Sequence, residues 1–195
     1  MSDAAAQRRA RQTLINLLLS LGATVGVMVL LVLAVPRDDS NRIQPVDYVA
    51  IANQASSEAP GKLLVPTIPV DWYSNGARFT SASQDGVANW YVGFVGPNGE
   101  FLAMTQGIDV NQTWIQLMLE SNKPSGNVEV QGKSWSIYES VRENSPPKSK
   151  DYMMVLEYDN NAVFVYGVAP KAVLEDLASQ LGDLIDEKMA TEEVN

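Results

Sequence analysis

The feature that most constrains this chain is an uncharged, apolar stretch that runs from Thr13 to Val35. Its roughly 23 residues would extend about 34 Å as an α-helix, which is enough to cross the hydrocarbon core of a bilayer. A cleaved secretory signal is the alternative, since Val32-Leu33-Ala34 has the small-residue spacing of a signal-peptidase site. The apolar region of a signal peptide is only about 7 to 15 residues long. The length therefore favours a retained transmembrane helix at residues 13–35.

Charges on the two flanks of this stretch predict its orientation. Arg8, Arg9 and Arg11 precede it, whereas the following residues 36–40 are mixed and slightly acidic. Basic residues close to a membrane helix are retained on the cytoplasmic side. We therefore expect residues 1–12 to be a cytoplasmic segment, and the rest of the chain to lie outside the plasma membrane, held by a single pass.

Small and polar residues form two stripes along the predicted helix. Asn16, Ser20 and Thr24 recur at a spacing of four, and Gly22 and Gly26 form a G-x-x-x-G pattern on roughly the opposite side. In lipid, glycine pairs allow close helix packing and a polar side chain gains from a hydrogen-bonding partner. We expect these residues to pack against a protein partner in the membrane. The alternative is chance spacing, with Asn16 near enough to the interface to stay hydrated.

The composition excludes several function classes. The chain has no cysteine and no histidine, which removes disulfides, thiolate nucleophiles, the common zinc sites and a neutral-pH imidazole base. From Pro36 onward, 11 basic and 22 acidic residues give a net charge of −11. Nucleic acids and anionic lipid surfaces are therefore not expected as partners, because binding to them depends on clustered Lys and Arg.

The region after the anchor divides into a linker, a domain and a tail. We expect residues 36–60 to be a juxtamembrane linker with a short helix, since Val46 and Val49 recur at helical spacing. Residues 61–188 are expected to form the extracytoplasmic domain, and 189–195 a polar tail. Pro66 and Pro69 restrict the apolar segment at 63–65 to an edge strand or an extended lead-in.

Alternating segments in the domain predict seven strands. Gly96-Pro97-Asn98-Gly99 is a hairpin signal, because Asn-Gly readily adopts positive φ. Two amphipathic helices are expected, one running from Asp109 or Asn111 to about Asn122 and one beginning at Pro170. No segment between the later strands is long enough for a crossover helix. The fold class is therefore α+β, with a mainly antiparallel sheet covered by two helices. The expected strands are 77–82, 87–95, 100–107, 128–131, 133–141, 152–158 and 162–168.

Aromatic residues supply the candidate surface for a ligand or partner. Trp72, Tyr73 and Tyr91 are the candidates, because flat rings stack on sugars and peptides and aromatic residues are enriched at interfaces. Strand alternation places Trp90 on the core side and Tyr91 on the opposite side. Packing in the core is the expectation for Trp90 and Trp135.

No catalytic residue, cofactor-binding residue or metal ligand set is assigned from the sequence. Glu129, Glu139, Asp151 and Glu157 lie on or near predicted strands, where a pair of acids could act as a carboxylate-dependent hydrolase. Lysine and arginine residues are interleaved with these acids, so alternating charges on a solvated sheet face explain the same pattern. The solvated face is the favoured reading, and the hydrolase remains open.

The order of several motifs resembles one family. They are the Arg-rich start with its anchor, 46–48 (VDY), 69–72 (PVDW), 90–94 (WYVGF) followed by the 96–99 turn, 132–135 (GKSW), and 166–167 (YG) before the last helix. With them the chain resembles the actinobacterial single-pass membrane proteins of domain-of-unknown-function family 4245. The resemblance covers nearly the whole chain. It implies a cell-envelope location and an α+β outer domain, and it brings no catalytic residue, cofactor or substrate.

The functional expectation is a membrane-anchored, extracytoplasmic accessory or interaction protein without catalytic activity. One form would be a small subunit of a larger membrane complex, for example a respiratory complex. The alternative is an envelope module that binds a glycan, peptide or lipid in a groove between the 109–122 helix and the sheet. That alternative predicts an apolar cavity beneath the helix.

Overall fold

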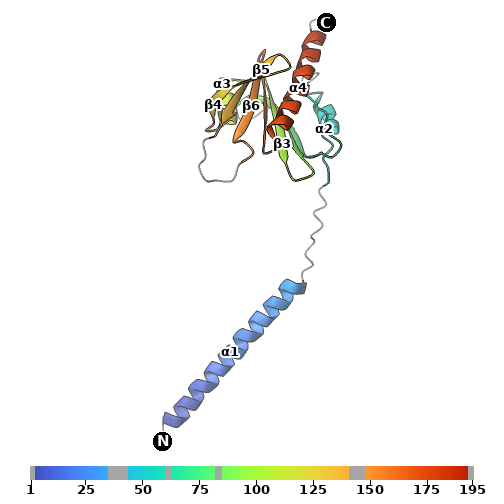
Figure 1. Ribbon diagram of the computed structural model, residues 1–195. Helices are drawn as coiled ribbons and strands as arrows, with labels where there is room; N and C mark the ends of the chain where they lie inside the picture. The colour runs from blue at the N-terminus through green and yellow to red at the C-terminus, as the bar shows by residue number, and fades with distance from the viewer. Residues whose placement is uncertain (1–2, 35–43, 60–62, 82–84, 141–147, 193–195) are drawn as a thin grey trace. The chain divides into compact units, whose positions relative to one another are not determined.

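The computed structural model describes residues 3–34, 44–59, 63–81, 85–140 and 148–192 (Figure 1). The chain forms two compact units, Met1–Arg42 and Ile43–Asn195. The second unit is called the sheet domain below.

The first unit contains one helix, α1 (Asp3–Ala34), whose described side chains are all exposed. Within it, the segment Arg11–Ala34 is long and apolar enough to span a bilayer. The helix predicted at 13–35 is therefore confirmed as a candidate membrane span. The hydroxyl of Thr24 donates a hydrogen bond to the Ser20 carbonyl oxygen at 2.9 Å, so this part of the polar stripe is satisfied within α1.

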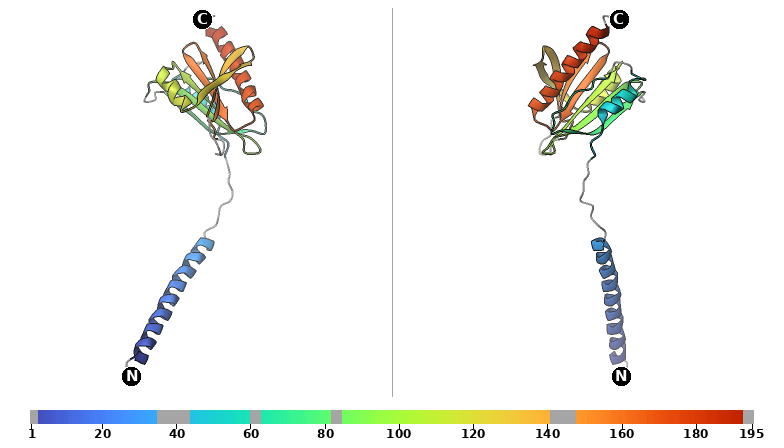
Figure 2. Two further views of the ribbon diagram at one scale, coloured as in Figure 1. Left: turned by 60° about the vertical axis from the view of Figure 1, so that its left-hand side comes forward. Right: turned by 90° about the vertical axis from the view of Figure 1, so that its right-hand side faces the viewer.

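The sheet domain is built on a seven-stranded sheet in the order β1-β2-β3-β7-β6-β5-β4 (Figure 2). Neighbouring strands in this sheet run antiparallel, which confirms the predicted α+β fold. The hairpin at 96–99 is also confirmed, since Gly99 has φ of 81° and its N–H donates to the Gly96 carbonyl at 3.0 Å. The strands are β1 (Tyr73–Thr80), β2 (Ala88–Val95), β3 (Phe101–Ile108), β4 (Lys123–Val130), β5 (Lys133–Glu139), β6 (Tyr152–Tyr158) and β7 (Asn161–Gly167).

Helices cover both faces of this sheet. Face A, which carries Trp90, Val92 and Phe94, packs against α2 (Tyr48–Ala55) and α4 (Lys171–Glu192). Face B, which carries Phe164 and Tyr166, packs against α3 (Gln112–Leu119). Figure 2 shows α3 on the side of the sheet opposite α4. The strand alternation places Trp90 and Trp135 in the core of face A, where both are fully buried.

The structure describes helices at both predicted boundaries of the sheet domain. The predicted linker at 36–60 includes α2, and α2 packs on face A: Ala52 and Ala55 are buried, and the Tyr48 ring meets Phe94 edge-on at 5.4 Å. The compact unit accordingly begins at Ile43. At the other end, residues 189–192 of the predicted polar tail belong to α4, which ends at Glu192. The last buried hydrophobic residue of this helix is Ile185. Residues 35–43 and 193–195 lie outside the described residues.

Residues 63–69 form no helix or strand, and their apolar side chains pack on face A as a segment called the strap below. Side chains of the sheet bind both backbone groups of Leu64. The indole Nε1 of Trp90 donates to its carbonyl at 3.0 Å, and its N–H donates to Oε1 of Gln106 at 2.9 Å. The Gln106 amide in turn donates to the Tyr158 hydroxyl at 3.0 Å. The strap is thus held by side chains in place of strand pairing.

We expect Gln106→Leu to lower the free energy of unfolding by about 2 kcal/mol, because the buried N–H of Leu64 loses its acceptor. Gln180→Leu is the matched control. Gln180 also accepts from the strap, through the Thr67 N–H at 3.2 Å, but this contact is exposed and water replaces it. Urea unfolding followed by circular dichroism measures both variants. Equal losses would contradict the role of Gln106.

Candidate functional site

The three aromatic candidates do not form one surface. Trp72 is half-buried against the core of face A, beside Gly96, whose added Cβ would lie 2.8 Å from the indole. Tyr73 begins β1 opposite Val95 and is half-buried. Tyr91 lies on face B. Of the three, only Tyr91 belongs to the cluster described next, and the partner role of each remains a prediction.

The Tyr91 ring lies against two glycines, Gly76 and Gly93. An added Cβ on Gly93 would lie 2.5 Å from the Tyr91 hydroxyl oxygen, and one on Gly76 would lie 3.8 Å from the ring. Arg78 is directly opposite Tyr91 on β1, and its guanidinium carbon is 5.7 Å from the ring centroid. A cation in this position is attracted to the face of the ring. Glycines thus let the ring lie flat, and Arg78 covers it.

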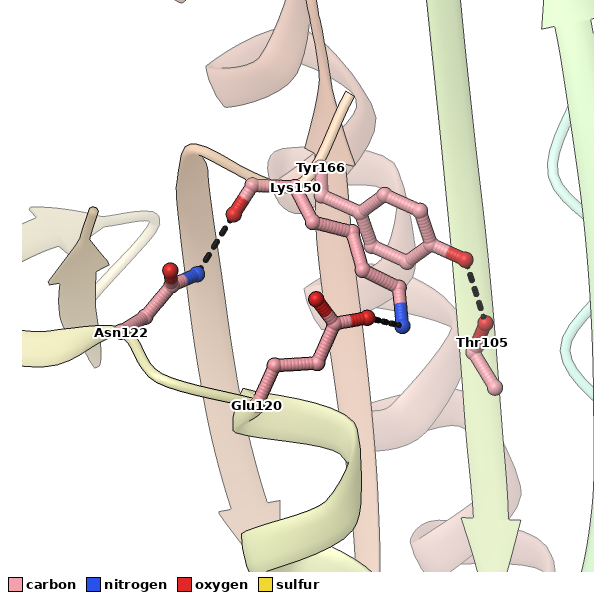
Figure 3. Close-up of polar contacts among 5 residues, drawn as sticks. All are labelled: Thr105, Glu120, Asn122, Lys150 and Tyr166. Atoms are coloured by element: carbon pink, nitrogen blue, oxygen red, sulfur yellow. Dashed lines mark hydrogen bonds and ion pairs between the residues drawn. The ribbon is translucent and has the colours of Figure 1, made fainter. Parts of the chain in front are cut away.

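A second tyrosine lies deeper on the same face (Figure 3). Tyr166 on β7 is 5% exposed, and its hydroxyl shares a hydrogen bond of 3.0 Å with the Thr105 hydroxyl on β3. Lys150 lies over its ring at 5.7 Å and forms an ion pair of 2.8 Å with Glu120. Tyr91 pairs with Thr105 across β2 and β3. We call Arg78, Tyr91, Thr105, Tyr166 and Lys150 the tyrosine cluster.

The end of α3 holds Lys150 in place. Glu120 caps this helix with φ of 55°, and the Asn122 side-chain amide donates to the Lys150 carbonyl (Figure 3). A hollow of about 270 Å³ opens here, and charged or polar residues line it, including Lys148 and Asp151. It offers hydrogen-bonding groups to a polar partner.

Both tyrosines of the cluster have raised pKa values. Burial is the main cause of the raised pKa of Tyr91, and the neighbouring Tyr166 adds to it, while Arg78 opposes it. Burial likewise raises the pKa of Tyr166, while the hydrogen bond shared with Thr105 and the charge of Arg78 lower it. The raised pKa values keep both phenols protonated at neutral pH. Such a cluster is suited to binding.

These raised pKa values predict a loss of stability at alkaline pH. Tyrosine in an unfolded chain ionises near pH 10, whereas folded Tyr166 stays neutral to higher pH. Between the pKa of the unfolded chain and the higher pKa of the folded protein, the unfolded state binds fewer protons than the folded state. The free energy of unfolding therefore falls as pH rises through this range. We expect Tyr166→Phe to flatten this decline in urea unfolding measured between about pH 9 and pH 11. An unchanged slope would contradict the prediction.

The candidate acids lie apart. Glu129 on β4 and Glu157 on β6 are exposed and have β5 between them, which separates their backbones by about 10 Å. Glu139 forms an ion pair with Lys171 at 3.5 Å, and Asp151 accepts from the Lys148 N–H at 2.7 Å. Among the described residues, no group of three or more acidic side chains is placed to hold a metal ion.

The space under α3 is filled with side chains. Trp114 packs edge-on against Phe164 at 5.6 Å, and an added Cβ on Gly107 would lie 2.6 Å from the Trp114 ring. Ile115 and Leu119 are also buried there. These side chains belong to the buried cluster between α3 and face B.

Sequence reasoning found one residue of the cluster and missed four. The hairpin at 96–99 fixes the register of β2 against β3, so counting back from the turn would have paired Tyr91 with Thr105. No comparable signal marked Tyr166 or Lys150, because Tyr166 meets Thr105 across 61 residues of sequence and Lys150 meets Glu120 across 30.

The architecture defines a class of protein, an α+β domain preceded by one candidate membrane-spanning helix. The chain belongs to the family described as protein of unknown function (DUF4245), whose family model matches residues 9–181. This confirms the resemblance found in the sequence, and the actinobacterial source stays a prediction. No curated protein and no solved structure matches the chain.

Proposed function

We propose that this chain is a membrane-anchored accessory protein of the cell envelope, without catalytic activity, that acts by binding another protein. In this proposal α1 is embedded in the plasma membrane with its N-terminus inside, and the sheet domain is extracytoplasmic. The filled core on both faces of the sheet carries the proposal. In a domain packed in this way, the side chains available for binding lie on the surface, where a protein partner can reach them.

The anchor supports a partner within the bilayer. Gly22 and Gly26 lie one helical turn apart and carry no side chain, so a second helix could approach α1 closely along this face. Asn16, on the other stripe, is exposed in the isolated helix. In lipid, close glycine packing and a hydrogen bond to asparagine both stabilise a helix pair. A subunit of a larger membrane complex, such as a respiratory complex, would use both features.

The side chains present in the sheet domain support a non-enzymatic role. The chain has no histidine or cysteine, and the acids Glu129 and Glu157 lie on strands separated by β5. Tyr91 and Tyr166 hold their protons at neutral pH. These groups lack the base and nucleophile that a hydrolase places side by side.

Crosslinking in intact cells tests the proposal. A tagged full-length chain is crosslinked, purified in a mild detergent and analysed by mass spectrometry. We expect one or a few membrane or envelope proteins in near-stoichiometric amounts. Recovery of the monomer alone would contradict the proposal. Recovery of a glycan, peptide or lipid without a protein would instead support the alternative, an envelope ligand-binding module.

Two double variants in α1 test whether the glycine face of this helix contributes to partner binding. We expect Gly22→Leu with Gly26→Leu to reduce recovery of the partner, because leucine side chains hold the helices apart. Val25→Leu with Val29→Leu is the matched control, since it changes neighbouring apolar residues and keeps the glycines. Equal recovery with both pairs would show that the glycine face is not a contact.

A further inference from the structure

We propose that the Arg78–Tyr91 corner of face B docks an acidic segment of the partner protein, with Arg78 binding an Asp or Glu carboxylate of that segment. This inference rests on the proposed function and names the surface that performs it. The occupant is a peptide segment that carries carboxylates, and the reasons lie in the coverage of face B, the order of the corner and its charge.

The corner borders the cluster that α3 buries on face B: Tyr91 packs against that cluster, and Asn89 is paired with Gly107 on β3. The helix packs over Phe164 on β7 and against Gly107 on β3. On the neighbouring strands β1 and β2, Arg78 is exposed, and Tyr91, Thr80 and Asn89 are partly exposed. These four residues form two directly opposed pairs, Arg78 with Tyr91 and Thr80 with Asn89. They make a flat, polar and aromatic surface on two paired strands.

The corner is ordered before any partner arrives. Gly76 and Gly93 leave space that the Tyr91 ring fills, and the ring supports the Arg78 guanidinium at 5.7 Å. A guanidinium already held on a ring loses less conformational freedom when it binds than a free side chain does. Tyrosine and arginine are also the residues that most often dominate binding energy at interfaces.

Charge identifies the occupant. Lys133, Lys150 and Lys171 each have a carboxylate partner, Asp186, Glu120 and Glu139 respectively. Arg78 lies over the Tyr91 ring, and among the described residues no carboxylate forms an ion pair with it.

A guanidinium binds a carboxylate through two parallel hydrogen bonds. From Pro36 onward the chain carries a net charge of −11, so an acidic segment is repelled over most of the domain and attracted at this corner. Repulsion between the acidic segment and the rest of the domain would restrict the segment to the Arg78–Tyr91 corner.

Site-specific photocrosslinking tests this surface in the full-length protein in its own membrane. A benzophenone amino acid replaces Asn89, beside the corner, or Ser134, which is exposed on β5 at the opposite flank of face B. We expect a protein adduct from position 89 and none from position 134. An adduct from position 134 alone, or an adduct with lipid or nucleic acid at position 89, would overturn the proposal.

Variants of Arg78 test the chemistry. With the crosslinker at position 89, we expect R78E to reduce the adduct at least tenfold, and R78K to reduce it severalfold, because lysine keeps the charge and loses the paired hydrogen bonds. Near-ultraviolet circular dichroism checks the fold, and R78K decides the outcome if R78E does not fold. An undiminished adduct in the folded variants would overturn the proposal.

The two levels of the account fail separately. If chemical crosslinking of the whole chain captures a partner and position 89 does not, the docking corner is wrong and the accessory role stands. If neither captures a protein, both the corner and the accessory role are wrong.

Discussion

Gly167→Ala is expected to destabilise the sheet domain by about 3 kcal/mol, because the new methyl group has no room between two central strands. An added Cβ would press against the Phe101 carbonyl oxygen and lie 2.9 Å from the Leu102 Cα. The same oxygen accepts the N–H groups of Val168 at 2.9 Å and Ala169 at 3.1 Å. Moving the β3 backbone away would weaken both hydrogen bonds where β7 leads into α4.

Gly182→Ala is the matched control in a buried glycine of α4. Its added Cβ would lie 3.3 Å from the flexible Lys133 side chain, which can move aside. Alanine also favours the helix over glycine by roughly 1 kcal/mol. We therefore expect Gly182→Ala to be neutral or stabilising in urea unfolding. A loss at Gly167 no greater than that at Gly182 would contradict the packing of β3 against β7.

Trp90→Ala is expected to cost about 4 kcal/mol, through the cavity it opens in the core of face A. Trp90 is fully buried, and its indole is the donor to the Leu64 carbonyl at 3.0 Å. The variant therefore also leaves a strap carbonyl without its partner. Urea unfolding followed by far-ultraviolet circular dichroism measures the loss without relying on tryptophan fluorescence.

Comparison of Trp90→Phe with Trp135→Phe isolates the hydrogen bond from the volume. Both tryptophans are fully buried on face A, but Nε1 of Trp135 has no hydrogen-bond partner in the described structure. Phenylalanine removes a bonded donor at position 90 and an unpaired donor at position 135. We expect Trp90→Phe to cost about 1–2 kcal/mol more than Trp135→Phe. Equal costs would contradict the role of Trp90 in holding the strap.

Local patterns predicted most of the fold. Alternation in 87–95 and 100–107, with the Gly96–Gly99 turn between them, predicted the β2–β3 hairpin, because each signal acts over a few residues. A short helix was expected within 36–60, but the packing of α2 on the sheet was not predicted, for the opposite reason. Its small buried residues Ala52 and Ala55 give a weak helical stripe, and only the sheet surface they meet shows that the helix belongs to the domain. Tertiary contacts decide such short helices.

The candidate site was predicted only in part. Alternation along β2 predicted that Tyr91 points away from the core of face A. In the structure Tyr91 lies on face B, as predicted. The same argument gave no information on Trp72, because it precedes β1 and its packing beside Gly96 depends on the folded hairpin. Lys150 reaches Tyr166 and Glu120 from a different part of the chain. Sequence periodicity describes single elements, whereas this cluster forms between them.

Cysteine labelling tests the central claim, that α1 anchors the chain and the sheet domain lies outside the cell. The natural chain has no cysteine, so a single cysteine replacing exposed Thr113 or Gln7 reports its own position. Intact cells are treated with a membrane-impermeant maleimide, and membranes are then extracted with alkaline carbonate. The account predicts labelling at position 113, none at position 7 until the cells are opened, and a labelled chain that stays in the membrane pellet. Labelling at position 7 in intact cells, or release of the chain by carbonate, would contradict it.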